Sequence, residues 1–281
     1  MPDFATADPL QALHALLDRL AAEPAVLVEV QATEGSAPRD AGAWMAVFAG
    51  SVIATIGGGH LEWDAIAEAR AQLAAGAPRG ASQVRRVALG PSLGQCCGGV
   101  VTLRLQPVDW RDVPELATRL ARQRQSRLRP VALFGGGHVG HALVAVLGRL
   151  PFALTWIDSR DGVFPEPLPA GVACEHSEPV QGAVAHLAAQ SRVLIMSFSH
   201  AEDLDVLAAC LLRQREHADL PYIGLIGSKT KWAAFRHRLE ARGFRDDELA
   251  QVTSPIGVAG IAGKEPEVIA VAVAAQLLQA G

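Results

Sequence analysis

The sequence predicts an α/β protein, with an N-terminal α+β domain followed by a Rossmann-like domain that has a doubly wound parallel sheet. Its 281 residues are 50% hydrophobic, which is enough for two buried cores. Alternating valines near the N-terminus are typical of half-buried strands, whereas short apolar runs alternate with helical segments from Pro130 onwards. We therefore expect residues 1–109 to form the first domain, 110–129 an Arg-rich connector and 130–281 the second domain.

Charge and composition exclude several classes of protein. The 25 Lys and Arg residues are balanced by 29 Asp and Glu residues without a basic block, so we expect no nucleic-acid partner. The apolar runs are too short to cross a bilayer and no signal peptide is recognisable, so we expect a cytoplasmic protein with no membrane partner. The four cysteines, two adjacent and two scattered, agree with a reducing compartment.

The N-terminal domain is expected to combine several strands with two helices. Asp8 can cap the first helix and Pro9 suits its first turn, after which leucines recur on one face. The dipeptide Gly50-Ser51 joins two strands in the manner of a hairpin. The expected strands are 26–30, 44–49, 52–56, 84–89 and 100–105, and the second helix is 61–74.

Residues 110–129 are expected to form an Arg-rich helix or connector between the domains. Its arginines are Arg119, Arg122, Arg124, Arg127 and Arg129. We favour a solvated linker helix, because runs of charge are commonly solvated faces. The alternative is a basic rim that attracts an anionic ligand or a partner.

The second domain is expected to alternate regularly between strands and helices. The expected strands are 130–134, 152–157, 172–174, 193–198 and 222–226, and the expected helices are 138–150, 180–190, 201–214, 231–242 and 266–279. The last helix is apolar on several sides, so it either packs in the core, which we favour, or forms the seam of a homodimer.

A glycine loop in the second domain predicts phosphate binding. It fits the Gly-x-Gly-x-x-Gly pattern between a strand and a helix, where backbone N–H groups can hold a phosphate. Asp158 ends the next strand, where an acid can bind a ribose hydroxyl, and Arg160 either contacts a phosphate or lies on the surface. The alternative is a purely structural turn. The candidate residues are Gly135, Gly137, His138, Gly140, Asp158 and Arg160.

Two later loops in the second domain carry further polar candidates. Ser199 and His200 follow one strand, and Ser228 and Lys229 follow the next. His200 can face the ligand crevice outside the strand ends, and the Gly-Ser-Lys loop can bind a phosphate. The plainer interpretation is that Ser199 and Asp203 cap the helix that follows.

An earlier glycine loop at 57–60 also joins a strand to a helix, but it does not fit the dinucleotide pattern. Glu62 stands where that pattern requires a third glycine. Glu62 and Asp64 fall in the first helical turn, where acids suit the helix dipole, so this loop is either structural or functional.

The most unusual stretch is the loop that ends in Cys96-Cys97-Gly98-Gly99. Its glycines let the chain approach a ligand, and its two thiols can bind a soft metal, carry sulfur or act in redox chemistry. The spacing does not suit a four-ligand zinc site. The remaining cysteines, Cys174 and Cys210, are expected in the core.

With these loops in view, the chain resembles the XdhC/CoxI family from about residue 25 to 279. A departure occurs after Gly257, where many relatives have an Asp and this chain has none, as in the xanthine dehydrogenase branch. The matching segments are Gly35-Ser36-Ala37-Pro38-Arg39, 56–62, Gly94-Gln95-Cys96-Cys97-Gly98-Gly99, 134–140, Ser199-His200, Ile226-Gly227-Ser228-Lys229, Pro255-Ile256-Gly257 and Gly263-Lys264-Glu265-Pro266.

The resemblance implies a molybdenum-cofactor chaperone without independent turnover. Such a protein binds the molybdopterin cofactor, protects it, hosts its sulfuration with a cysteine desulfurase and delivers it to apo xanthine dehydrogenase. On this basis Cys97 contacts the cofactor and its molybdenum, and Cys96 supports it. Ser36, Arg39 and Glu62 are expected to line a cleft between the domains.

Two other functions stay open at this point. The first is an NAD(P)-dependent oxidoreductase, which the glycine loop and Asp158 favour but the lack of a Tyr-x-x-x-Lys set opposes, since Tyr222 is the only tyrosine. The second is a scaffold that bridges desulfurase and dehydrogenase without holding cofactor, which the cysteine loop opposes. The Rossmann-like domain can accordingly take a pterin, a nucleotide or both.

Overall fold

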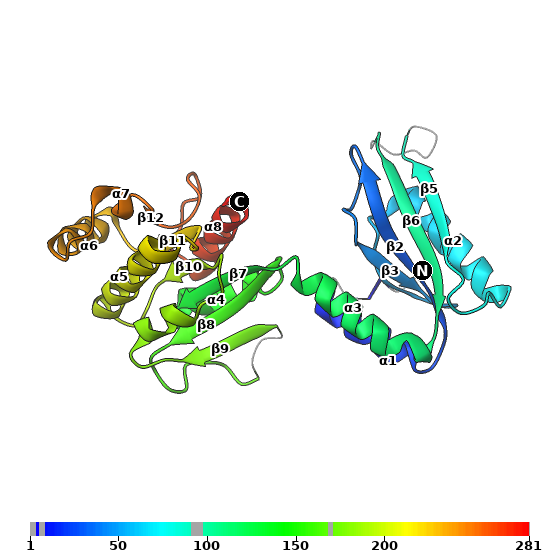
Figure 1. Cartoon of the computed structure of the whole chain (residues 1–281), viewed down its shortest axis with the longest axis horizontal. Coiled ribbons are helices and arrows are strands. Elements are labelled where there is room, and N and C mark those ends of the chain that lie inside the picture. Colours follow the sequence, from blue (N-terminus) through cyan, green and yellow to red (C-terminus); the bar gives the residue numbers. More distant parts are fainter. Residues whose placement is uncertain (1–3, 6–8, 91–97, 168–170, 281) are drawn as a thin grey trace. The chain divides into compact units, whose positions relative to one another are not determined.

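The chain divides into two units, Met1–Ser126 and Arg127–Gly281, in a computed structural model (Figure 1). The structure describes residues 4–5, 9–90, 98–167 and 171–280. None of the helices within those ranges has the length and hydropathy needed to span a bilayer.

The first unit is built on a six-stranded sheet, antiparallel except where β1 pairs with β4. The strand order is β1-β4-β3-β2-β6-β5. The strands are β1 (Phe4–Ala5), β2 (Ala25–Glu34), β3 (Trp44–Val47), β4 (Val52–Ala54), β5 (Gln83–Ala88) and β6 (Val100–Val108). The helices are α1 (Pro9–Leu20), α2 (Gly59–Ala74) and α3 (Val113–Gln125), with a 3-10 turn at Trp110–Asp112.

Helices cover both faces of this sheet. The even-numbered valines of β2 pack with Leu61 and Ile66 of α2, whereas Leu27 on the opposite face packs with Leu16 of α1 and Leu120 of α3. This two-faced burial follows from the period of two in a strand, which sends successive side chains to opposite faces. The N-terminal domain is therefore an α+β unit of three layers, as the sequence predicts.

The expectation for the Arg-rich segment needs a correction, because residues 110–126 belong to the first unit and 127–129 to the second. Leu116 and Leu120 of α3 are buried in the core shared with α1. Arg119 donates from Nη1 to Oε1 of the buried Glu29 at 2.5 Å, and Arg104 pairs with the same carboxylate. A buried carboxylate is costly unless it is paired, so α3 is fixed to the sheet by this contact. The boundary falls after Ser126.

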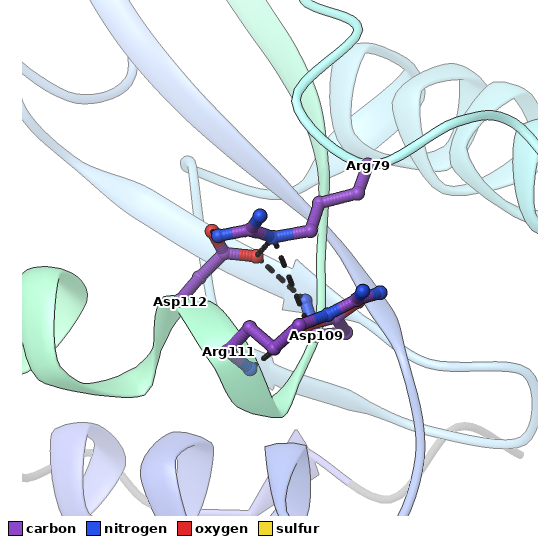
Figure 2. A network of polar contacts seen from close by, with 4 residues as sticks. All are labelled: Arg79, Asp109, Arg111 and Asp112. Carbon is purple, nitrogen blue, oxygen red and sulfur yellow. Dashed lines mark hydrogen bonds and ion pairs between the residues drawn. The ribbon is translucent and has the colours of Figure 1, made fainter.

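A polar network ties the chain after α2 to the start of α3 (Figure 2). Arg79 donates from Nε to both carboxylate oxygens of Asp112 at 3.1 Å and from Nη2 to Oδ1 at 2.7 Å. Asp109 caps the 3-10 turn by accepting from the N–H of Arg111 at 2.8 Å, and the Arg111 side chain returns to the same carboxylate. The network therefore joins two segments 33 residues apart.

Acid is expected to remove the contribution of Asp109 to stability. The hydrogen bond from the Arg111 side chain lowers the pKa of Asp109 from 3.8 to about 2. Because the folded-state pKa is depressed, this contribution is complete above about pH 4 and is lost as the pH falls through about 2. Urea midpoints of the wild type and Asp109→Asn, measured from pH 6 to pH 2, are expected to converge at low pH. A constant difference would contradict the assignment.

The second unit is a parallel six-stranded sheet in the order β12-β11-β10-β7-β8-β9. The strands are β7 (Arg129–Phe134), β8 (Phe152–Asp158), β9 (Val172–His176), β10 (Arg192–Ile195), β11 (Tyr222–Leu225) and β12 (Val252–Thr253). The helices are α4 (His138–Leu147), α5 (His200–His217), α6 (Lys229–Ala241), α7 (Asp246–Leu249) and α8 (Pro266–Gln279), with a 3-10 helix at Val180–His186.

This sheet is doubly wound, as predicted. From β7 the chain proceeds outwards to β8 and β9, and then returns to β10 on the other side of β7 (Figure 1). The reversal places the topological switch point between β7 and β10, where sheets of this kind bind their ligands outside the carboxyl ends of the strands. One face carries α4 and α8, and the other carries α5 and α6.

Several details differ from the sequence expectations. Residues 180–190 form a shorter 3-10 helix, Val180–His186, and α7 and β12 were not expected. Helix α8 buries Val273 and Leu277 against α4, which supports the core interpretation. The thiol of Cys210 is buried, and desolvation raises its pKa to about 12, so its predicted place in the core is confirmed. Cys174 lies half-buried on the edge strand β9.

Candidate functional site

Three loops of the first unit meet although they are far apart in the sequence. They are the loop 35–39 after β2, the turn 57–59 before α2 and the glycines just before β6. A Cβ on Gly99 would lie 2.4 Å from the carbonyl oxygen of Ser36, and a Cβ on Gly57 would lie 2.4 Å from Cβ of Pro38. The loop 35–39 therefore packs against both of the others, and only glycine fits at either point of contact.

Glu62 holds the middle loop in place. Its side chain is buried, and its Oε2 accepts from the Thr55 hydroxyl at 2.5 Å, from Ile56 N–H at 3.0 Å and from Gly58 N–H at 3.1 Å. Gly57 has φ +122°, which an L side chain rarely adopts, so this turn depends on glycine and on the carboxylate. The structure thus shows that Glu62 positions a turn, and its predicted place in a cleft between the domains stays a prediction.

The exposed residues at this meeting point include Ser36, Arg39, Gly57 and Gly98. They supply a hydroxyl, a guanidinium and accessible backbone, which suit an anionic, hydrogen-bonding ligand. Cys96 and Cys97, the predicted cofactor contacts, lie outside the described residues. Gly98 is the next residue along the chain, and Gly99 packs against the backbone of Glu34 and Ser36.

The glycine loop of the second unit follows β7 and begins α4. Gly135 has φ +121°, and a Cβ there would lie 2.0 Å from the carbonyl oxygen of Met196 at the end of β10. The indole N–H of Trp156 donates to the Gly135 carbonyl at 2.9 Å, and Gly140 packs on that same carbonyl. Gly137 differs, because no heavy atom lies within 4 Å of its Cβ position. The second glycine thus leaves open space, as a phosphate-binding loop requires.

Asp158 is engaged within the chain. Its Oδ2 accepts from Gly136 N–H at 2.6 Å, and Arg160 donates to its two oxygens from Nε and Nη2 at 2.9 Å each. Burial alone would raise the pKa of Asp158, but hydrogen bonds from Arg160 and from two backbone N–H groups outweigh it and hold the pKa below its ordinary value. The side chain is 1% exposed, so a ribose reaches it only if Arg160 moves.

The serines after β10 and β11 act as helix caps. Ser199 accepts from Glu202 N–H at 3.2 Å, and Ser228 accepts from Lys231 N–H at the same distance. The capping interpretation of Ser199 is therefore confirmed, whereas Asp203 has a different role. His200 and Lys229 are exposed at the starts of α5 and α6, where they remain candidates for contact with a ligand.

Sequence reasoning missed an ion pair that joins the first turns of α5 and α6. Lys231 donates from Nζ to Oδ2 of Asp203 at 2.6 Å and to the Ile226 carbonyl at 2.8 Å, and Asp203 accepts from Ser197 N–H at 2.7 Å. The Gly-Ser-Lys motif drew attention to Lys229, but Lys231 is the lysine turned inwards. The sequence held one signal for this lysine. Lys231 follows the capping serine Ser228 by three residues, so it lies in the first turn of the helix.

The described residues show no ready-made metal centre. Within the ranges that the structure covers, no group of three or more His, Cys, Asp or Glu side chains is placed to hold a metal ion. Among the groups left accessible are the Arg39 guanidinium in the first unit and the Gly137 backbone in the second.

These features define a class of protein with an α+β unit that presents three converging loops and a doubly wound, Rossmann-like unit. The family model described as XdhC Rossmann domain matches residues 131–277, and the model described as XdhC and CoxI family matches residues 19–87. The chain therefore belongs to the XdhC/CoxI family.

Two relatives illustrate the reach of this similarity. The chain is 26% identical over 259 residues to the uncharacterized protein YqeB of Escherichia coli (strain K12), covering 91% of this chain but only 43% of YqeB. It is also similar in structure to a protein described as a xanthine dehydrogenase from Bacillus halodurans, with a TM-score of 0.72 and 20% identity over 96% of this chain and 95% of that one. At this identity the structural likeness supports the fold alone.

Proposed function

We propose that the protein serves in xanthine dehydrogenase maturation, as a chaperone that binds the molybdopterin form of the molybdenum cofactor. It protects the cofactor, supports its sulfuration by a cysteine desulfurase and inserts it into the apo dehydrogenase. Membership of the XdhC/CoxI family supports the general role. The observation that carries the specific role is the convergence of three loops in the first unit, each of which belongs to a segment typical of the family.

The exposed groups of these loops suit the cargo. A phosphate on the pterin is anionic, so the Arg39 guanidinium and the Ser36 hydroxyl are fitting partners. Cys97 directly precedes Gly98 in the chain, and its thiolate is a sulfur ligand that a transition metal such as molybdenum can accept. The net charge of −4 does not oppose this, because binding depends on a few local groups.

Replacing Cys97 tests the proposal. After anaerobic purification from cells that make molybdopterin, Cys97→Ala is expected to carry about tenfold less molybdenum than the wild type, because a direct ligand matters at least as much as a supporting one. Cys174→Ala is the matched control, since it removes a half-buried thiol from the edge strand of the other unit. Unchanged molybdenum content in Cys97→Ala would refute the role of this thiol.

A nucleotide-dependent oxidoreductase is the second candidate, favoured by the open space at Gly137 at the start of α4. Titration with NAD(H) and NADP(H), combined with a turnover assay, separates the two. Turnover with a nicotinamide cofactor would favour the oxidoreductase. Binding of apo xanthine dehydrogenase and desulfurase without any molybdenum would instead favour a scaffold, and the mass of the protein in solution tests the proposed homodimer.

A further inference from the structure

Two contacts join the loops after β8 and β10 across the loop of β7. Strand β7 lies between β10 and β8 in the sheet, so the glycine loop lies between the other two loops. Ser159 donates from Oγ to Oε1 of Glu202 at 2.8 Å, and the Arg160 guanidinium lies over the Phe198 ring at 4.5 Å from its centroid. Both contacts therefore span the switch point.

Arg160 and Glu202 are each held by a second partner. Arg160 is fixed by two hydrogen bonds to Asp158, and Asp158 in turn accepts from the Gly136 N–H of the glycine loop. Glu202 accepts from Phe198 N–H at 3.1 Å through its other oxygen. The contacts and the glycine loop therefore form one connected set of interactions.

The exposed parts of this set are suited to a ligand. Phe198 is 64% exposed although large apolar side chains are usually buried, and the Arg160 side chain is 35% exposed. An arginine recognises a phosphate with the same two-pronged geometry with which it binds a carboxylate. A phenylalanine ring offers a stacking surface to a planar heterocycle as readily as to a guanidinium.

We propose that Ser159, Arg160, Phe198 and Glu202 form a latch that closes the switch point, and that a phosphorylated aromatic heterocycle opens it. The phosphate of the ligand replaces the Asp158 carboxylate as partner of Arg160, and the ring of the ligand replaces the guanidinium on Phe198. The observed ligand affinity is then reduced by the fraction of molecules in which the latch is closed. The latch lies wholly in the second unit, so it does not depend on the proposed cofactor site of the first.

Ser159→Ala is the cleanest test, because it removes one contact of the latch without touching Arg160 or Phe198. In the full chain, we expect AMP, NADP⁺ or neopterin monophosphate to bind Ser159→Ala about fivefold more tightly than the wild type. This is the effect expected when the closed state loses one hydrogen bond. Phe198→Ala is expected to bind more weakly, since it removes the stacking surface. Ser177→Ala is the matched control, because the hydroxyl of this serine in the same unit donates to the Pro179 carbonyl and not to a member of the latch.

A second measurement needs no ligand. Amide hydrogen exchange at Arg160 and Phe198 is expected to be about fivefold faster in Ser159→Ala than in the wild type. The Phe198 N–H donates to Glu202 of the latch, and the Arg160 N–H donates to Asp158, which holds the latch residue Arg160. Binding of AMP or NADP⁺ alone identifies the ligand as a nucleotide, and binding of neopterin monophosphate alone identifies it as a pterin. Unchanged affinity and unchanged exchange in Ser159→Ala would overturn the latch, and failure of all three compounds to bind would overturn its opening by such a ligand.

Discussion

Gly135→Ala is expected to destabilise the second unit by about 3 kcal/mol or more, through overpacking and backbone strain together. The new methyl group would lie 2.0 Å from the Met196 carbonyl oxygen, which is backbone and cannot swing away. The φ of +121° adds strain that an alanine cannot relieve. Because β7 and β10 are central strands, moving them apart would disturb the hydrogen bonds of the whole sheet.

Gly137→Ala is the matched control for this prediction. It lies two residues further along the same loop, with φ −81° and no heavy atom within 4 Å of the added Cβ. Thermal unfolding should show a fall of about 10 °C for Gly135→Ala and almost none for Gly137→Ala. Equal melting temperatures for the two variants would show that β7 and β10 can separate without cost.

Removing one member of the buried pair between Lys231 and Asp203 is expected to cost about 3–5 kcal/mol. The two side chains are 12% and 3% exposed, and Asp203→Ala would leave the ammonium without a charged partner, with the Ile226 carbonyl and the Phe235 ring still beside it. It would also remove the acceptor of the Ser197 N–H. The loss should therefore exceed that of any surface pair.

A comparison of variants tests whether an unpaired buried charge causes the loss of stability in Asp203→Ala. The double variant Asp203→Leu with Lys231→Met leaves no unpaired charge, so urea unfolding should find it more stable than Asp203→Ala. Arg236→Ala removes an exposed arginine paired with Glu240 and Asp246, and should cost less than about 1 kcal/mol. If Asp203→Ala and Arg236→Ala cost the same, the buried pair has no special role.

The fold could be predicted largely from periodicity, since strand alternation and apolar runs report burial directly. Prediction failed where tertiary contacts determine the position of an element. The arginines of α3 suggest a solvated face, but Leu116, Leu120 and the pairing of Arg119 with Glu29 hold this helix on the sheet. Strand β12 has only two residues and is formed by pairing with β11, so it is too short for a periodic pattern to predict it.

The candidate site was only partly predictable for a related reason. Patterns locate loops, but they do not say where a carboxylate points. Glu62 and Asp158 are predicted to contact ligands, and the structure adds that both accept hydrogen bonds from the backbone of glycine loops. These hydrogen bonds form only when the glycine loops follow a particular path, and that path is set by packing against other parts of the fold. For the same reason, the sequence could not show that Lys231 is mostly buried while Lys229 is exposed.

The pairing of Arg119 with Glu29 has a consequence for synthesis of the protein. These residues are 90 positions apart, and the central strand β2 pairs along its length with β6. On the ribosome, the first unit therefore cannot complete its core until α3 has left the exit tunnel. During that interval the apolar strand β2 stays exposed on the emerging chain, and exposed apolar surface of this kind is what chaperones bind.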